Sequence, residues 1–207
     1  MEINVIRQRR TAQIWRAGGM IWLILITCFF AFLDLYFADL SPFSTMMTGA
    51  FIAMITIILF YRSLKNLNHA KKLPDEKTEE GSQKGKHMLK WFLIILAIEI
   101  VALNITSVVL WKSDHFQYIV PVDILIVSLH FIPLGRIFTM PVYYLLGIII
   151  SFIVLLTIIF IPASSRIGNL IAVAAIPSLS FILLNWMVII YILRDRMKYQ
   201  VKISAGK

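Results

Sequence analysis

Residues 141–161 read PVYYLLGIIISFIVLLTIIFI and contain no Asp, Glu, Lys, Arg or His. An apolar run of about 20 residues is long enough to cross a bilayer as an α-helix, whereas a barrel strand would alternate over about 10 residues. Hydrophobic residues make up 59% of the chain, above the roughly 45–50% that is usual in soluble domains. Because backbone groups in lipid must be satisfied within helices or closed barrels, the pattern predicts an all-α integral membrane protein.

Similar apolar segments recur along the chain. We expect membrane spans at about 19–37, 43–61, 91–111, 118–138, 141–161 and 167–193, which predict one six-transmembrane-helix bundle over residues 1–207. Segment 62–90 is the only extended polar stretch, and its mixed charge, Gly and Pro predict a mobile cytoplasmic linker. The first apolar segment is long and is followed by no small-residue cleavage site, which favours an uncleaved span over a signal peptide.

Lys and Arg are distributed unevenly among the loops that these spans leave. One side carries Arg7, Arg9, Arg10, Arg16, the Lys-rich linker, Arg136, Arg194, Arg196, Lys198, Lys202 and Lys207. The other side carries only Lys112 and Arg166. Because cytoplasmic loops keep an excess of Lys and Arg, both termini are predicted to be cytoplasmic. Attraction to anionic lipid headgroups accounts for the net charge of +9, so we expect anionic lipids, and no nucleic acid, as partners.

The sequence carries no signature of an enzyme or of a cofactor site. Cys28 is the only cysteine, so neither an intramolecular disulfide nor a Cys-based metal site can form. No His-Glu-x-x-His motif and no Gly-x-Ser-x-Gly motif occurs. We therefore expect no catalytic residue, no metal and no cofactor, with an intramembrane enzyme as the remotest of the functional alternatives.

Ionisable side chains inside the expected spans are the candidate functional residues, because each costs about 2.5–3.5 kcal/mol to insert. They are Asp34 in the first span, Glu99 in the third, and Asp123 and His130 in the fourth. Asp123 and His130 lie seven residues apart, close to two turns, and therefore share a helix face. The third and fourth spans should pack antiparallel across a short loop, which predicts a Glu99–His130 pair at their interface.

Two interpretations of the Glu99–His130 pair stay open. The pair can hold the bundle together, or it can be a proton- or cation-responsive pair in a transporter-like or channel-like protein, because histidine changes charge near physiological pH. Pro133 and Pro177 predict kinks or breaks, and discontinuous helices are typical of transport cavities. A hydrated cavity that reaches Glu99 and His130 would distinguish transport from the rival class, a non-transporting scaffold or interaction protein.

Small and amide side chains inside the spans predict contacts between helices. Gly147 with Ser151, and Gly168 with Ala172, are small residues four apart that allow helices to approach closely. Asn169 and Asn185 are interpreted as interhelical hydrogen-bonding residues rather than as substrate ligands.

One stretch resembles a known group of proteins. Residues 129–138 read LHFIPLGRIF, and residues 141–147 read PVYYLLG. This stretch resembles a segment of a family of small bacterial multi-pass membrane proteins of unknown function. The resemblance covers about twenty residues in spans four and five. It implies a bacterial membrane setting and directs interest to His130, Pro133 and Arg136, and it brings no activity or substrate.

Overall fold

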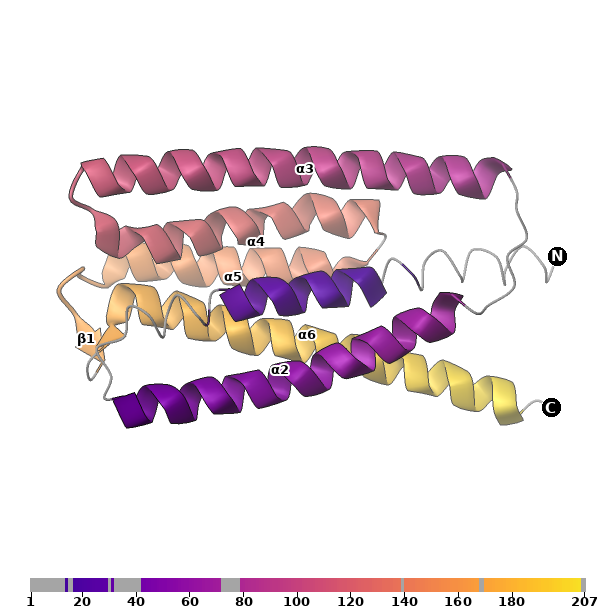
Figure 1. Ribbon diagram of the computed structural model, residues 1–207. Coiled ribbons are helices and arrows are strands. Elements are labelled where there is room, and N and C mark those ends of the chain that lie inside the picture. Colours follow the sequence, from indigo (N-terminus) through magenta and orange to yellow (C-terminus); the bar gives the residue numbers. More distant parts are fainter. Residues whose placement is uncertain are drawn as a thin grey trace.

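The computed structural model describes residues 14, 17–29, 31, 42–71, 79–138, 140–167 and 170–205. These residues form an all-α fold with one very short β-hairpin (Figure 1). The elements in chain order are an apolar helix Ala17–Phe29, α2 (Pro42–Lys71), α3 (Glu79–Lys112), the 3₁₀ turn η1 (Phe116–Tyr118), α4 (Ile119–Ile137), α5 (Pro141–Phe160), β1 (Arg166–Ile167), β2 (Leu170–Ile171) and α6 (Ala172–Ala205).

Five of these helices are long and apolar enough to cross a membrane. Their apolar segments are Met46–Asn68, Lys86–Lys112, Phe116–Ile137, Pro141–Phe160 and Ala172–Arg194. The helix Ala17–Phe29 is apolar but shorter. It covers the first part of the span expected at 19–37, and residues 30 and 32–37 of that span lie outside the described residues.

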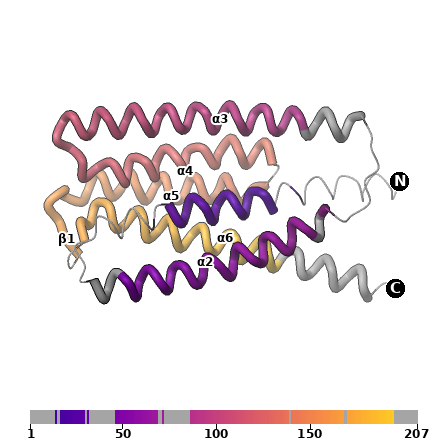
Figure 2. The backbone as a smooth tube through the Cα atoms, viewed as in Figure 1, coloured from indigo at the N-terminus to yellow at the C-terminus, as the bar shows by residue number. Residues whose placement is uncertain are grey.

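The long helices lie side by side along one common direction, with α3 outermost on one side (Figure 1). Figure 2 shows α3 joined to α4 at the end of the bundle where β1 lies, and α4 joined to α5 at the opposite end. Helix α4 packs against α3, α5 and α6, and more than half of its apolar segment is buried. By contrast, α2 and α3 bury little of their apolar segments against the rest of the described chain.

Aromatic side chains fill the contact between α4, α5 and α6. The ring of Phe131 stacks on Tyr143 at 6.1 Å and on Phe181 at 6.3 Å, and all three side chains are fully buried. Met20 and Leu23 of the helix Ala17–Phe29 belong to the same buried cluster. Burying a side chain of this size contributes about 1.5–3 kcal/mol when water is the alternative. In lipid, close packing is the main source of the attraction.

Two predicted features differ in the structure. Helix α2 continues to Lys71 and α3 begins at Glu79, so much of segment 62–90 is helical, and residues 72–78 lie outside the described residues. Lys, Glu, Gln and Leu recur in this segment and are good helix formers. Helix α4 also runs unbroken through Pro133, and α6 through Pro177. Neighbouring helices in a bundle can compensate the hydrogen bond that each proline removes.

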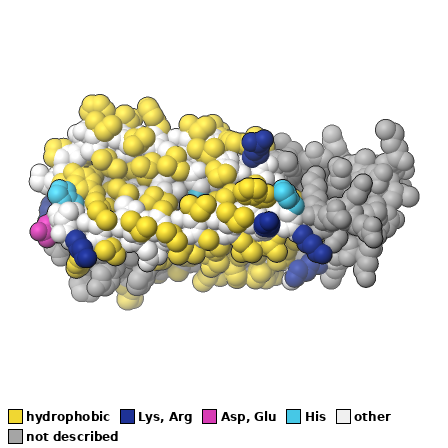
Figure 3. Space-filling view, turned by 90° about the horizontal axis from the view of Figure 1, so that it is seen from above, with side chains coloured by type: hydrophobic (Ala, Val, Ile, Leu, Met, Phe, Trp, Pro, Cys, Tyr) yellow, Lys and Arg dark blue, Asp and Glu magenta, His cyan; other side chains and the backbone are white. Residues whose placement is uncertain are grey.

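The exposed Lys and Arg side chains gather toward the ends of the bundle. Arg62, Lys65, Lys71, Lys86, Lys90, Arg136 and Arg194 lie toward the end where α4 joins α5. Lys112 and Arg166 lie at the other end. On the face that Figure 3 shows, hydrophobic side chains are spread over the surface between the two ends.

Candidate functional site

Glu99 occupies an unusual position on α3. Among the α3 side chains that the structure describes, residues 86–112, it is the only one that is buried, with 6% of its surface exposed. The apolar neighbours Ile98, Ile100 and Val101 are all exposed. The helix therefore turns its carboxylate toward the bundle, together with partly buried apolar side chains such as Ile95 and Leu103. Its exposed aliphatic side chains face away, as expected of a helix with an apolar environment outside and a polar partner inside.

The polar partner of Glu99 is His130 on α4. His130 is 5% exposed, and its Nδ1 nitrogen is in direct ion-pair contact with the Oε2 oxygen of Glu99. The structure thus brings together the two residues that the antiparallel packing of the third and fourth spans predicts. Nε2 of His130 has no hydrogen-bond partner among the described residues, so one ring nitrogen is left for a further polar group or a water molecule.

A second polar contact joins the same two helices. The side chain of Ser107 on α3 lies beside the carboxylate of Asp123 on α4, within reach of a hydrogen bond, and Asp123 is 7% exposed. Its Oδ1 oxygen has no hydrogen-bond partner among the residues described. Ser107 lies eight residues after Glu99, and Asp123 seven residues before His130. At about 1.5 Å per residue, the two contacts therefore lie about two helical turns apart along the interface of the antiparallel helices α3 and α4.

Ser107 is the residue of this site that the sequence reasoning missed. Its signal is its spacing of eight residues from Glu99, which places it near the same helix face. Thr106, seven residues after Glu99, instead donates its hydroxyl to the Ala102 carbonyl oxygen at 2.6 Å. Asn104 likewise donates to the Ile100 carbonyl oxygen at 2.7 Å. Both polar groups are satisfied within α3 and take no part in the contact with α4.

Other predicted polar residues lie elsewhere. Asp34 and Asn169 are outside the described residues. Asn185 on α6 is fully buried, and neither its Oδ1 nor its Nδ2 atom has a hydrogen-bond partner among the described residues. Ser178, two turns earlier on the same helix, is also fully buried with an unpartnered hydroxyl in the described part of the chain. Buried polar atoms of this kind are commonly satisfied by internal water.

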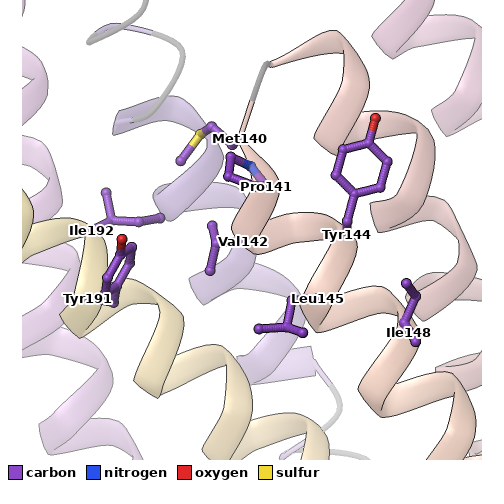
Figure 4. Close-up of a pocket in the computed structure, with 8 residues that line it drawn as sticks. All are labelled: Met140, Pro141, Val142, Tyr144, Leu145, Ile148, Tyr191 and Ile192. Carbon is purple, nitrogen blue, oxygen red and sulfur yellow. The ribbon is translucent and has the colours of Figure 1, made fainter.

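Two cavities of the described chain do not include the acid–imidazole pair. The larger has a volume of about 800 Å³ and lies between α5 and α6 (Figure 4). The smaller, of about 230 Å³, lies beside the helix Ala17–Phe29 and is lined by side chains such as Trp22 and Phe92. Neither is lined by Glu99, Asp123 or His130, each of which is at most 7% exposed.

The chemistry open to the site is proton exchange. A carboxylate in contact with an imidazole can share or transfer a proton, and each transfer changes the local charge in a region of low dielectric. The described residues contain no group of three or more His, Cys, Asp or Glu side chains that could hold a metal ion. The pair is therefore built from two ionisable groups, with Ser107 and Asp123 as a second contact.

Comparison with known proteins adds no further assignment: no family model, no curated protein and no solved structure matches this chain.

Proposed function

We propose that this chain is a six-span integral membrane protein of a bacterial cytoplasmic membrane, with both termini in the cytoplasm. The helix Ala17–Phe29 would belong to the first span. Five long apolar helices and exposed apolar surfaces along α2 and α3 support insertion in lipid. The gathering of exposed Lys and Arg at one end of the bundle supports the orientation, since positive residues favour the cytoplasmic side.

We further propose that the protein is proton-responsive, and that the Glu99–His130 pair couples protonation to the packing of α3 on α4. The observation that carries this proposal is that Glu99 is the only buried side chain among those described on α3 and that it contacts His130. An ionisable residue inside a membrane is retained at a cost and marks a functional site by default. Asp123 is a buried carboxylate of α4 and belongs to the same seam, the contact between α3 and α4.

The attachment of α3 to the bundle depends on its contact with α4, where the pair lies. Among the described elements, α3 packs mainly against α4 and η1, so the seam with α4 holds it in the bundle. Removing one partner of a buried ion pair typically costs about 3–5 kcal/mol, a large part of the roughly 5–15 kcal/mol that stabilises a protein. A change in the charge of Glu99 or His130 would therefore shift the equilibrium between attached and displaced α3.

A transport pathway would need the α3–α4 seam to open. The unbroken course of α4 and α6 removes the discontinuous helices that Pro133 and Pro177 were expected to produce, and the two cavities do not include the pair. The buried pair favours a second candidate, a non-transporting scaffold in which Glu99 and His130 only fasten two helices together. The two candidates differ in whether the packing of α3 on α4 changes with pH.

The test follows the distance between α3 and α6 in reconstituted protein. Spin labels at Val101 and Leu183, both exposed, are introduced in a Cys28→Ser background, because Cys28 is the only native cysteine. We expect the distance distribution to change between pH 8 and pH 5 in this background and to stay fixed in Glu99→Gln. The control His115→Gln alters an exposed histidine and should keep the pH response.

Two outcomes would overturn the proposal: a distance that does not change with pH, or a change that persists in Glu99→Gln. Either would leave the scaffold as the better account.

Proton flux in vesicles, driven by a pH gradient and measured with an internal dye, then separates two forms of the responsive protein. Flux that is lost in folded Glu99→Gln indicates transport, whereas a pH-dependent distance without flux indicates a proton-responsive protein that does not transport.

A further inference from the structure

The larger cavity lies at the end of the bundle where positive charge gathers. It is about 800 Å³ in volume and is formed by the first turns of α5 and the part of α6 near Tyr191 and Ile192 (Figure 4). Leu145 and Ile148 line it from α5. Its volume falls within the roughly 300–1,000 Å³ typical of ligand sites.

We propose that this cavity binds an acyl chain of an anionic phospholipid, whose phosphate is held by Arg194 and Arg136. The inference rests on the membrane insertion proposed above and is independent of the proton response. It adds a defined site and a headgroup preference to the general expectation that anionic lipid lies at this face.

The walls of the cavity suit a hydrocarbon chain. Leu145, Ile148 and Ile192 are aliphatic, and more than half of the surface of Leu145 and of Ile148 is exposed. These side chains therefore open toward the surroundings of α5 and α6, which are lipid in a membrane-inserted protein. An acyl chain can enter sideways from the bilayer, whereas a polar solute would find few hydrogen-bonding groups on these walls.

Two tyrosines mark the polar end of the cavity. The hydroxyl groups of Tyr144 and Tyr191 both point toward the end of the bundle where α4 joins α5 (Figure 4). Tyr144 also packs on α4, because a Cβ added to Gly135 would meet its Cδ2 atom at 2.7 Å. Tyrosines are enriched where an apolar region meets headgroups, so the cavity has an apolar body and a polar rim facing the same way.

Two exposed arginines close in sequence to the cavity residues complement a phosphate. Arg194 is exposed and lies three residues after Tyr191, on the same side of α6. Arg136 is exposed in the last turn of α4, and the link into α5 is tight because the Met140 amide donates to the Gly135 carbonyl oxygen at 3.0 Å. Arg binds phosphate through paired hydrogen bonds, so an anionic lipid is favoured over a neutral one.

The test measures how much lipid stays bound to the full chain. The protein is reconstituted in nanodiscs that contain equal amounts of phosphatidylglycerol and phosphatidylcholine with matched acyl chains, and the lipids retained after detergent extraction are counted by native mass spectrometry. We expect retained phosphatidylglycerol to exceed phosphatidylcholine several-fold. Leu145→Trp and, separately, Ile148→Trp, which fill the cavity, should each lower that retention about tenfold.

The matched controls separate this site from ordinary lipid contact. Leu183→Trp, at an exposed position of α6 outside the cavity, should retain phosphatidylglycerol as the unmodified chain does. Arg194→Gln combined with Arg136→Gln should abolish the preference between the two lipids while the cavity remains open. Inorganic phosphate added at millimolar concentration should displace nothing, because the acyl chain supplies the anchoring contact.

Three results would overturn the site: equal retention of the two lipids by the unmodified chain, equal effects of Leu145→Trp and Leu183→Trp, or full retention in both cavity variants at unchanged melting temperature. A chain that does not enter the nanodisc at all would contradict membrane insertion itself. A chain that enters but retains no lipid selectively would contradict only the lipid site.

Discussion

Gly147 on α5 faces the backbone of Ser128 on α4 so closely that an added Cβ would lie 2.7 Å from the Ser128 carbonyl oxygen. The same Cβ would lie 3.0 Å from Cγ1 of Ile132. Glycine at this position allows the two helix backbones to approach, as small residues do in membrane bundles. This contact sets the spacing of α4 and α5, the most extensively packed pair of described elements.

Gly147→Ala should destabilise the bundle. A methyl group here meets backbone rather than a flexible side chain, so α4 and α5 must separate, and overpacking of this kind typically costs about 1–3 kcal/mol. The measurement is the thermal unfolding midpoint in detergent. Gly18→Ala is the control, because nothing lies within 4 Å of a Cβ at Gly18, and we expect it to leave the midpoint unchanged or slightly higher. Equal behaviour of the two variants would contradict the close approach.

His130→Ala should strongly destabilise the chain, because it leaves the buried Glu99 carboxylate without its partner. The expected loss is about 3–5 kcal/mol in the free energy of unfolding. Replacing both residues by leucine should recover most of that loss, since an apolar pair avoids the burial of charge. Chemical unfolding in mixed micelles measures both variants.

The control for this pair is His87→Ala. His87 is exposed and accepts a hydrogen bond from Nε1 of Trp91 at 3.0 Å, so its removal should change the free energy of unfolding by no more than about 0.5 kcal/mol. A double leucine variant as unstable as His130→Ala would show that the two side chains contribute through something other than their mutual contact.

Ser107→Ala should cost about 1–3 kcal/mol, because it removes a hydrogen-bond donor from the buried carboxylate of Asp123. Ser113→Ala removes a hydroxyl that is exposed and donates to the Val109 carbonyl oxygen at 2.8 Å. We expect that control to stay within about 0.5 kcal/mol of the unmodified chain. Urea unfolding followed by tryptophan fluorescence compares the two, and a smaller effect for Ser107→Ala than for Ser113→Ala would rule out the contact of Ser107 with Asp123.

Phe131→Ala should lower the free energy of unfolding by about 3–5 kcal/mol. It removes the ring that stacks on both Tyr143 and Phe181 and leaves a cavity between three helices. Phe152 lies on α5 with 61% of its surface exposed, so Phe152→Ala should cost much less. Differential scanning calorimetry measures the contrast, and similar losses for both phenylalanines would contradict a central role for the Phe131 stack.

The elements of the fold could be read from the sequence with few errors. Apolar runs and their lengths are local properties, so the five long apolar helices lie close to the spans predicted at 43–61, 91–111, 118–138, 141–161 and 167–193. The effect of proline was less predictable: Pro133 and Pro177 were expected to kink or break their helices, which run on unbroken. A proline removes one hydrogen bond, and whether the helix survives depends on neighbours that the local sequence does not specify.

The candidate site was partly predictable for the same reason. Antiparallel packing across a short loop brings Glu99 near His130, and counting residues was enough to expect that pair. The contact of Ser107 with Asp123 depends on how far α3 is rotated about its own axis. Residue spacing does not fix this rotation to better than a fraction of a turn. Thr106 and Ser107 are adjacent in sequence, and only the packed helices select between them.

The sequence by itself determined an all-helical chain with long apolar segments, because hydrophobicity and chain length act residue by residue. Tertiary structure alone decided that Glu99 is the buried side chain among residues 86–112 of α3, that the cavity forms beside Tyr144 and Tyr191, and that α4 packs against three other helices. These features depend on the rotation, register and spacing of whole helices. Packing between helices, which includes the close backbone approach at Gly147 and Ser128, sets all three.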